Sequence, residues 1–120
     1  MATVNLDTAS RLDITCRKGD TFTMDLDFGQ AMNTTGWEMQ VRLTDTSEGT
    51  NNIILGGDFS FAVADNDNGV TNAKVTVSVT AAVMATIASG NYVYDLQNNL
   101  NDVVKTYLFG IFKVNEDITV

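Results

Sequence analysis

The stretch from Gly90 to Val114 constrains the fold most, because it holds two β-rich runs joined by a polar Asn/Asp turn. In the first run, Tyr92, Tyr94 and Leu96 alternate with Val93, Asp95 and Gln97. The second run is apolar on both faces, with Val104, Leu108, Phe112 and Val114 on one and Val103, Tyr107, Phe109 and Ile111 on the other. Period-two alternation predicts strands, and two apolar faces predict cover on both sides. The stretch predicts the central hairpin of a β-sandwich.

The rest of the chain repeats this alternation in shorter runs. Residues 11–28 alternate on both sides of a Lys-Gly-Asp turn and predict a second hairpin. Thr80 is a predicted N-cap and Gly90 a predicted C-cap of one short helix. Further strands are predicted to begin near Trp37, Ile53, Phe59 and Lys74. Together these runs predict an all-β fold, an antiparallel sandwich of about 7–9 strands with one short crossover helix.

The domain organisation expected from this pattern is simple. Residues 1–10 lack strong periodicity and are interpreted as an N-terminal arm, and residues 11–120 as a single β-sandwich domain. The glycines at 19, 69 and 90 are expected at positive φ. Cys16 is interpreted as a small buried hydrophobe. The side chains predicted to point inward are Leu12, Ile14, Phe22, Met24, Leu26, Phe28, Trp37, Met39, Val41, Leu43, Phe59, Phe61, Val75, Val77, Tyr92 and Leu108.

Composition narrows the classes of function. The net charge of −8 argues against nucleic acid as a partner. No apolar run approaches the length of a membrane helix, and the first residues do not resemble a signal peptide, so synthesis in a cytoplasm and no membrane association are expected. The chain has no histidine, which removes the commonest general base and most zinc sites. We therefore expect no enzyme and no cofactor.

Two polar motifs have a functional and a plain interpretation. The run from Asp65 to Gly69 resembles the start of a calcium loop, with Asp65 and Asp67 as weak ligand candidates, but the rest of such a loop is missing. A hairpin turn with Asn68-Gly69 is the favoured interpretation. Asn33-Thr34-Thr35 has only the form of a glycosylation site.

One aromatic group also has two interpretations. Trp37, Tyr92 and Tyr94 could line a sugar-binding face, although aromatic residues at strand period belong more often to the core. A carbohydrate-binding β-sandwich module is therefore an alternative function from another class.

A set of short motifs follows a characteristic order along the chain: Lys18 to Phe22, Thr35-Gly36-Trp37, Gln40 to Arg42, Gly90 to Gln97, Gly110, Val114 and Asp117-Ile118-Thr119. This ordered set resembles a small Ig-like domain of tailed-bacteriophage virion proteins, such as the N-terminal domain of phage baseplate upper proteins. The resemblance implies a non-enzymatic, Ig-like structural subunit, made in the host cytoplasm and located in the virion. It implies other virion proteins, or further copies of the chain, as partners. A tail, baseplate or fibre-attachment component is the leading expectation, and a capsid decoration protein is the alternative.

The doubly apolar strand also predicts where such a subunit makes contact. A sandwich strand fills its share of the core with one face, so Val103, Tyr107, Phe109 and Ile111 form a surplus face. We expect these residues, or the N-terminal arm, to contact another chain. Cover by the helical segment from Ala81 to Ala88 is the alternative.

Overall fold

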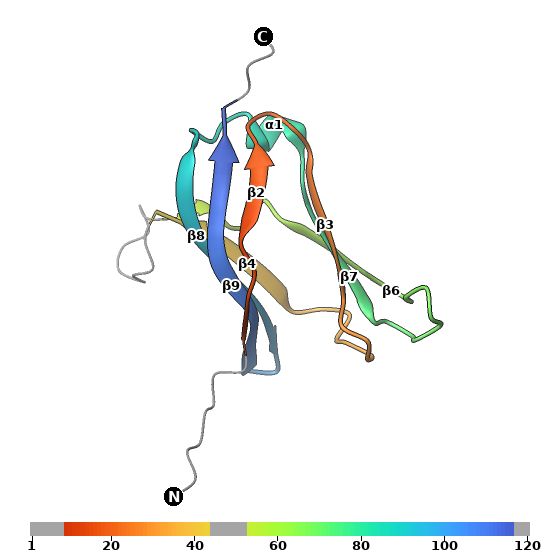
Figure 1. Cartoon of the computed structure of the whole chain (residues 1–120). Helices are drawn as coiled ribbons and strands as arrows, with labels where there is room; N and C mark the ends of the chain where they lie inside the picture. The colour runs from red at the N-terminus through yellow and green to blue at the C-terminus, as the bar shows by residue number, and fades with distance from the viewer. Residues whose placement is uncertain (1–8, 44–52, 117–120) are drawn as a thin grey trace, which may run out of the picture.

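A computed structural model describes residues 9–43 and 53–116, and Figure 1 shows them as two β-sheets packed face to face. One helical turn lies at one end of the sandwich, between β7 and β8. In chain order the elements are β1 (Ser10–Arg11), β2 (Ile14–Arg17), β3 (Phe22–Asp27), β4 (Trp37–Arg42), β5 (Ile53–Leu55), β6 (Ser60–Ala64), β7 (Lys74–Val79), α1 (Ala81–Met84), β8 (Gly90–Leu100) and β9 (Val103–Asn115).

The strand order is that of an Ig-like sandwich. The larger sheet has the order β9-β8-β4-β5, and β1 and β2 both pair in parallel with the free side of β9. The smaller sheet has the order β3-β7-β6 and is antiparallel. These neighbours reproduce the separation of strands C, F and G, with an added C′, from strands B, E and D in Ig domains. The predicted fold class is therefore confirmed, with β1 and β2 as its parallel part.

The predicted hairpin over residues 11–28 is wrong. The Lys-Gly-Asp turn does connect two strands, but β2 pairs with β9 in the larger sheet and β3 pairs with β7 in the smaller one. The turn therefore carries the chain from one sheet to the other. Alternation identified both strands because it depends on burial of one face, but it contains no information about the pairing partner. Ser10, the last residue of the expected N-terminal arm, lies in β1.

The alternation placed most of the core correctly. Phe22, Trp37, Met39, Val41, Phe59, Val75, Val77, Tyr92 and Leu108 are buried, and Ile14, Met24, Leu26, Phe28 and Phe61 are partly buried against them. Leu12 and Leu43 are wrong predictions, with 39% and 52% of their surface exposed. Leu12 lies in the break between β1 and β2, and Leu43 lies one residue beyond β4. Strand alternation does not extend past the ends of a strand.

The helix and its glycine differ in part from expectation. Thr80 is the N-cap, as predicted, with its hydroxyl accepting from the Val83 N–H at 3.4 Å. The C-cap, however, is Ala85 in ordinary helical conformation, and Gly90 opens β8 with φ +155°. Gly19 and Gly69 occupy turns at φ +85° and +79°, as expected. Ile87 lies beyond the end of the helix and is still buried in the core, so the apolar spacing alone overstated the length of the helix.

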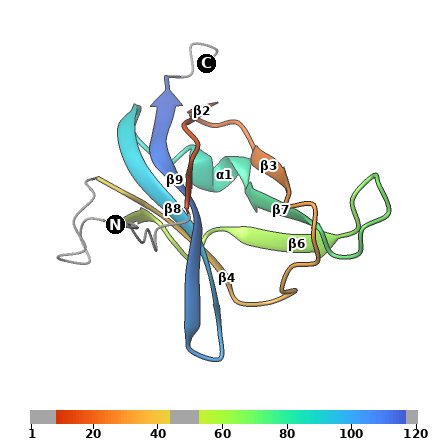
Figure 2. The same ribbon diagram turned by 60° about the horizontal axis from the view of Figure 1, so that its bottom comes forward.

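The predicted central hairpin is formed by β8 and β9, which pair antiparallel over their full length. Asn101 and Asp102 form its turn with φ values of +54° and +66°, as a two-residue type I′ turn requires. Figure 2 shows that the lower part of this hairpin extends past the rest of the sandwich. We call residues 98–107 the projecting hairpin.

Candidate interaction surface

A β-bulge divides the four residues that the sequence placed on one surplus face. Leu96 of β8 pairs with Leu108, but Gln97 pairs with Thr106, which leaves Tyr107 as an extra residue in β9. Such a bulge shifts the alternation by one and turns the strand. The Tyr107 ring lies 5.3 Å from both the Phe28 and the Trp37 ring centroids, on the core side. Tyr107 is therefore separated from the other three residues.

Phe109 and Ile111 lie beyond the bulge, on the outward face of the larger sheet. In the register of β8 and β9 they stand opposite Asp95 and Val93. Phe109 is 36% exposed and Ile111 is partly buried. Burial raises the pKa of the Asp95 carboxyl, and the Arg42 charge opposes that shift. This face combines apolar and charged groups.

The helix does not cover this face, so the intramolecular alternative is wrong. Met84 and Ile87 are almost fully buried in the same core cluster as Phe112 and Val114. Those two residues lie on the opposite side of β9 from Phe109 and Ile111, because neighbouring strand residues alternate between faces. The apolar side chains of the helical segment are thus packed between the two sheets.

Val103 lies at the tip of the projecting hairpin, where three apolar side chains are exposed. The exposed fractions are 36% for Leu100, 72% for Val103 and 54% for Val104. They surround the turn at Asn101 and Asp102. A folded chain gains little from apolar side chains left in water, so this cluster is a candidate contact surface. We call Leu100, Val103 and Val104 the apolar tip.

The base of the projecting hairpin is held by a buried asparagine. Asn98 is 3% exposed, and its side-chain amide donates to the Thr35 carbonyl at 2.9 Å while its oxygen accepts from Asn33 at 2.8 Å. The Asn99 N–H donates to the Gly36 carbonyl at 2.7 Å. A side chain at Gly36, which has φ +86°, would contact the Asn99 carbonyl oxygen. The loop between β3 and β4 therefore fixes the hairpin at its origin.

An aromatic cluster of Phe28, Trp37 and Tyr107 supports the same base. Phe28 stacks on Trp37 at 5.8 Å, and the Trp37 indole N–H donates to the Asn33 carbonyl at 2.8 Å. The Lys105 ammonium lies 5.0 Å from the centre of the Tyr107 ring. The projecting hairpin thus has a rigid base and an exposed tip.

The predicted sugar-binding aromatics are not on the surface. Trp37, Tyr92 and Tyr94 are 7%, 7% and 4% exposed. The Tyr92 hydroxyl donates to the Ala88 carbonyl four residues upstream, the contact known as a tyrosine corner in Ig-like domains. These three rings are structural, which removes the observation that motivated a carbohydrate-binding module.

The Tyr94 hydroxyl marks a site that sequence reasoning missed. It donates to the Leu12 carbonyl at 2.5 Å, and burial raises the pKa of Tyr94 to about 12. A side chain at Gly110 would meet that same Leu12 carbonyl oxygen and the Asp13 carboxylate. The Ile111 N–H donates to Asp13 at 3.0 Å, which lowers the pKa of that carboxyl. The mid-strand glycine was the available signal: it lets the break between β1 and β2 cross β9 closely.

The candidate calcium residues belong to a loop that is bonded to itself. The Asp65 carboxylate accepts from the Asn72 N–H at 3.1 Å, and Asp67 is exposed in the turn. Between them, the Asn66 side-chain oxygen accepts from the N–H groups of Asn68 and Val70. Within residues 9–43 and 53–116 there is no group of three or more acidic, cysteine or histidine side chains suited to a metal. In the same residues, no helix is long and apolar enough to span a bilayer.

The chain is similar to several solved structures at low sequence identity. No family model matches the chain, and no curated protein matches it. Similar solved structures include CopC from Methylosinus trichosporium OB3b, with 14% identity and a TM-score of 0.42 over 94% of this chain and 89% of that one. The extracellular fragment of novel immune-type receptor 11 from Ictalurus punctatus has 12% identity and a TM-score of 0.42, covering 91% and 87% of the two chains. The NK cell receptor Nkp44 has 14% identity and a TM-score of 0.40, covering 89% and 98%. These scores are too low to transfer a function.

Proposed function

We propose that this chain is a non-enzymatic structural subunit of a tailed-phage virion, made in the host cytoplasm and incorporated into the particle. A tail, baseplate or fibre-attachment component is the favoured position, and a capsid decoration protein is the alternative. The resemblance of the ordered motifs to Ig-like virion domains supports the proposal, as does the Ig-like topology. The partners are other virion proteins.

The observation that carries the proposal is the apolar tip on a rigid base. Val103 and Val104 are 72% and 54% exposed, so they contribute little to the core of the isolated domain. Burying a valine side chain in an interface stabilises an assembly by about 1.5 kcal/mol or more. The base is already ordered by Asn98 and by the ring of Tyr107, so docking of the tip requires little ordering of the chain. The apolar tip can therefore bind another virion protein without a change of fold.

The test removes the apolar groups of the tip and follows incorporation into particles. The double variant Val103→Thr and Val104→Thr keeps the β-branched shape, so the isolated domain should keep its melting temperature. Leu43→Thr is the matched control, because Leu43 is an exposed apolar residue at the other end of β4 from Trp37. Tagged chains are expressed in infected host cells, and particles are separated on density gradients.

Wild type and Leu43→Thr are expected to co-sediment with particles, and the double variant to be reduced roughly tenfold. Each substitution removes one buried methyl group, worth about 0.8 kcal/mol, and about 1.4 kcal/mol corresponds to a factor of ten. Separation of heads from tails then distinguishes the tail or baseplate position from capsid decoration. If wild type stays in the slow-sedimenting fraction, the chain is no virion subunit. If the double variant assembles normally, the tip is not the contact.

A further inference from the structure

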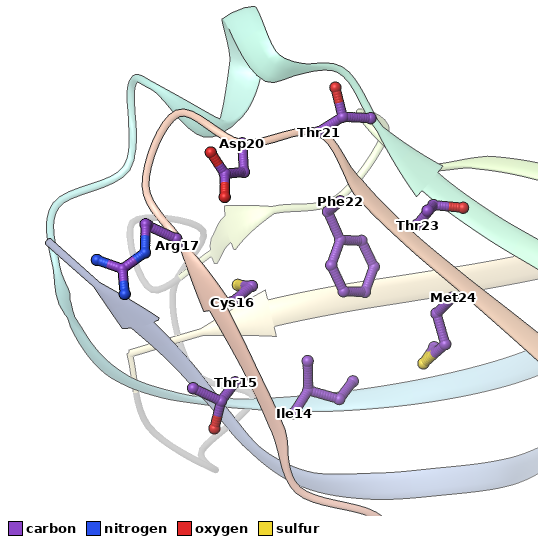
Figure 3. A pocket seen from close by; sticks show the side chains of 9 residues that line it. All are labelled: Ile14, Thr15, Cys16, Arg17, Asp20, Thr21, Phe22, Thr23 and Met24. Atoms are coloured by element: carbon purple, nitrogen blue, oxygen red, sulfur yellow. The ribbon is translucent and has the colours of Figure 1, made fainter. Parts of the chain in front are cut away.

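A groove opens between the two sheets on the side where β2 and β3 face each other. Its volume is about 450 Å³, and Figure 3 shows side chains from both strands pointing into it. Ile14 and Cys16 come from β2, and Phe22 and Met24 come from β3. Three of these four residues are only partly buried, although all belong to the core or pack against it. The core is therefore accessible along this side.

The strand that borders the groove has a free edge. β3 pairs along its whole length with β7, and in the described part of the chain no strand pairs with its other side. A strand paired on one side presents alternate N–H and C=O groups on the other, which is a template for a further strand. The side chains of β3 that face inward are Phe22, Met24 and Leu26, spaced two residues apart. An added strand with the same spacing of apolar residues would bond to β3 and fill the groove.

The chain contains such a segment outside the described residues. Ala2, Val4 and Leu6 alternate with polar residues in the sequence that precedes Ala9. The length of residues 2–7 matches that of β3, which has six residues. An extended strand places Val4 and Leu6 on one face, with Asn5 on the other.

The direction in which the chain enters β1 favours an arm from another molecule. Ser10 pairs in parallel with Leu108, and the chain then runs along β9 toward Arg17. β1 therefore begins at the end of this path that is farther from the turn at Gly19. To lie along β3 of its own molecule, the arm would have to reverse its direction directly before β1. A second copy has no such restriction.

We propose that residues 2–7 of one copy add as a strand to the free edge of β3 in a second copy, with Val4 and Leu6 in the groove. The contact is heterologous, because the arm and the groove are different surfaces. Repetition gives a ring if the rotation closes and a filament if it does not. The projecting hairpin takes no part, so this proposal and the proposed function can fail independently.

The first experiment measures self-association of the full chain. Sedimentation velocity over a range of concentrations should show species larger than the monomer whose fraction rises with concentration. The variant Val4→Asp and Leu6→Asp should be monomeric at every concentration, since it is unfavourable to bury unpaired carboxylates against Phe22 and Met24 in the groove. Its melting temperature serves as the control for folding. A wild-type chain that is monomeric throughout overturns the proposal.

The second experiment uses Cys16 in the groove, the single cysteine of the chain, as a reporter. Val4→Cys or Leu6→Cys should form disulfide-linked dimers and longer ladders with Cys16 on a non-reducing gel, and Asn5→Cys is the matched control on the opposite face. Burial raises the pKa of Cys16 to about 11, so an added oxidant such as copper phenanthroline is needed. The expected yield for Leu6→Cys is roughly fivefold above that for Asn5→Cys, and Cys16→Ser should abolish the ladder.

The pattern of bands shows whether the arm in a groove comes from the same molecule or from another copy. A ladder that weakens on dilution supports exchange between copies. A faster-migrating monomer that persists on dilution shows that the arm fills its own groove, and this result overturns the proposal. Equal crosslinking by Asn5→Cys and Leu6→Cys also overturns it, because no defined strand face would then point into the groove.

Discussion

The hairpins β6–β7 and β8–β9 differ in the length of their turns and in the polarity of the residues around them. The first has a long polar loop over residues 65–73, in which the Asn66 side chain bonds to two backbone N–H groups. The second turns in two residues, Asn101 and Asp102, and exposes apolar side chains beside the turn. Long loops usually carry function, but here the long loop is bonded internally and the short turn carries the exposed cluster.

The two hairpins are alike at their bases and differ beyond them. Each base has a buried asparagine that bridges to another part of the chain: Asn66 donates to the Asp27 carboxylate at 3.1 Å, and Asn98 donates to the Thr35 carbonyl at 2.9 Å. Both asparagines are less than a tenth exposed. The stability of each hairpin therefore depends on its base. The tip of β8–β9 is left to make contacts outside the domain.

The largest expected effect is at the base of the projecting hairpin. Trp37→Ala removes the ring that packs on Phe28 and Tyr107 and the N–H that donates to Asn33. We expect a loss of about 3–5 kcal/mol in the free energy of unfolding. Urea denaturation measures it. A loss below about 1 kcal/mol would show that the base does not depend on this cluster.

The second prediction tests the equivalence of the two asparagines. Asn66→Ala leaves the N–H groups of Asn68 and Val70 without their acceptor, so a loss of about 2–3 kcal/mol is expected. Asn98→Ala should give a loss of similar size, and Asp67→Ala, in the exposed part of the loop, a loss below about 0.5 kcal/mol. Thermal unfolding of the three variants checks this order. An Asn66→Ala variant as stable as Asp67→Ala would contradict the equivalence of Asn66 and Asn98.

A smaller and opposite effect is expected at the two-residue turn. Asp102 has φ +66°, a conformation that glycine adopts without steric strain. Asp102→Gly should therefore stabilise the domain by about 0.5 kcal/mol, after the greater freedom of glycine in the unfolded chain is subtracted. Calorimetry of the isolated domain is sensitive enough to detect it. Destabilisation would mean that the aspartate side chain has a role of its own in the turn.

The smallest effect concerns pH and the loop of β6–β7. Hydrogen bonds from Asn66 and from the Gly29 N–H lower the pKa of Asp27 below its ordinary value of 3.8. Because the folded pKa is the lower one, the contribution is complete above the unfolded value and is lost as pH falls through the folded value. Stability measured from pH 5 to pH 2 should fall less steeply in Asp27→Asn than in wild type. The same decrease of stability at low pH in both proteins would show that the Asp27 carboxylate does not stabilise this loop.

Much of the fold was predictable from alternation alone. Phe22, Met39, Val75 and Tyr92 were placed in the core correctly, because a strand with one buried face must alternate whatever its neighbours are. The polar Asn/Asp turn between the two long strands was also predicted, whereas its type I′ geometry at Asn101 and Asp102 was seen only in the structure. The exposed Val103 was part of the predicted interaction group, although the reason given for it was a shared face.

Only the tertiary structure decided which strands pair and where the alternation shifts. β2 and β3 were both predicted as strands, yet their separation into different sheets follows from contacts with β9 and β7, which are distant in sequence. The bulge at Tyr107 depends on the register between two strands, and a single extra residue reverses the direction of the side chains. The groove beside β3 exists because β2 and β3 lie in different sheets. Local pattern reports burial of a face, whereas pairing and register are properties of the assembled sheets.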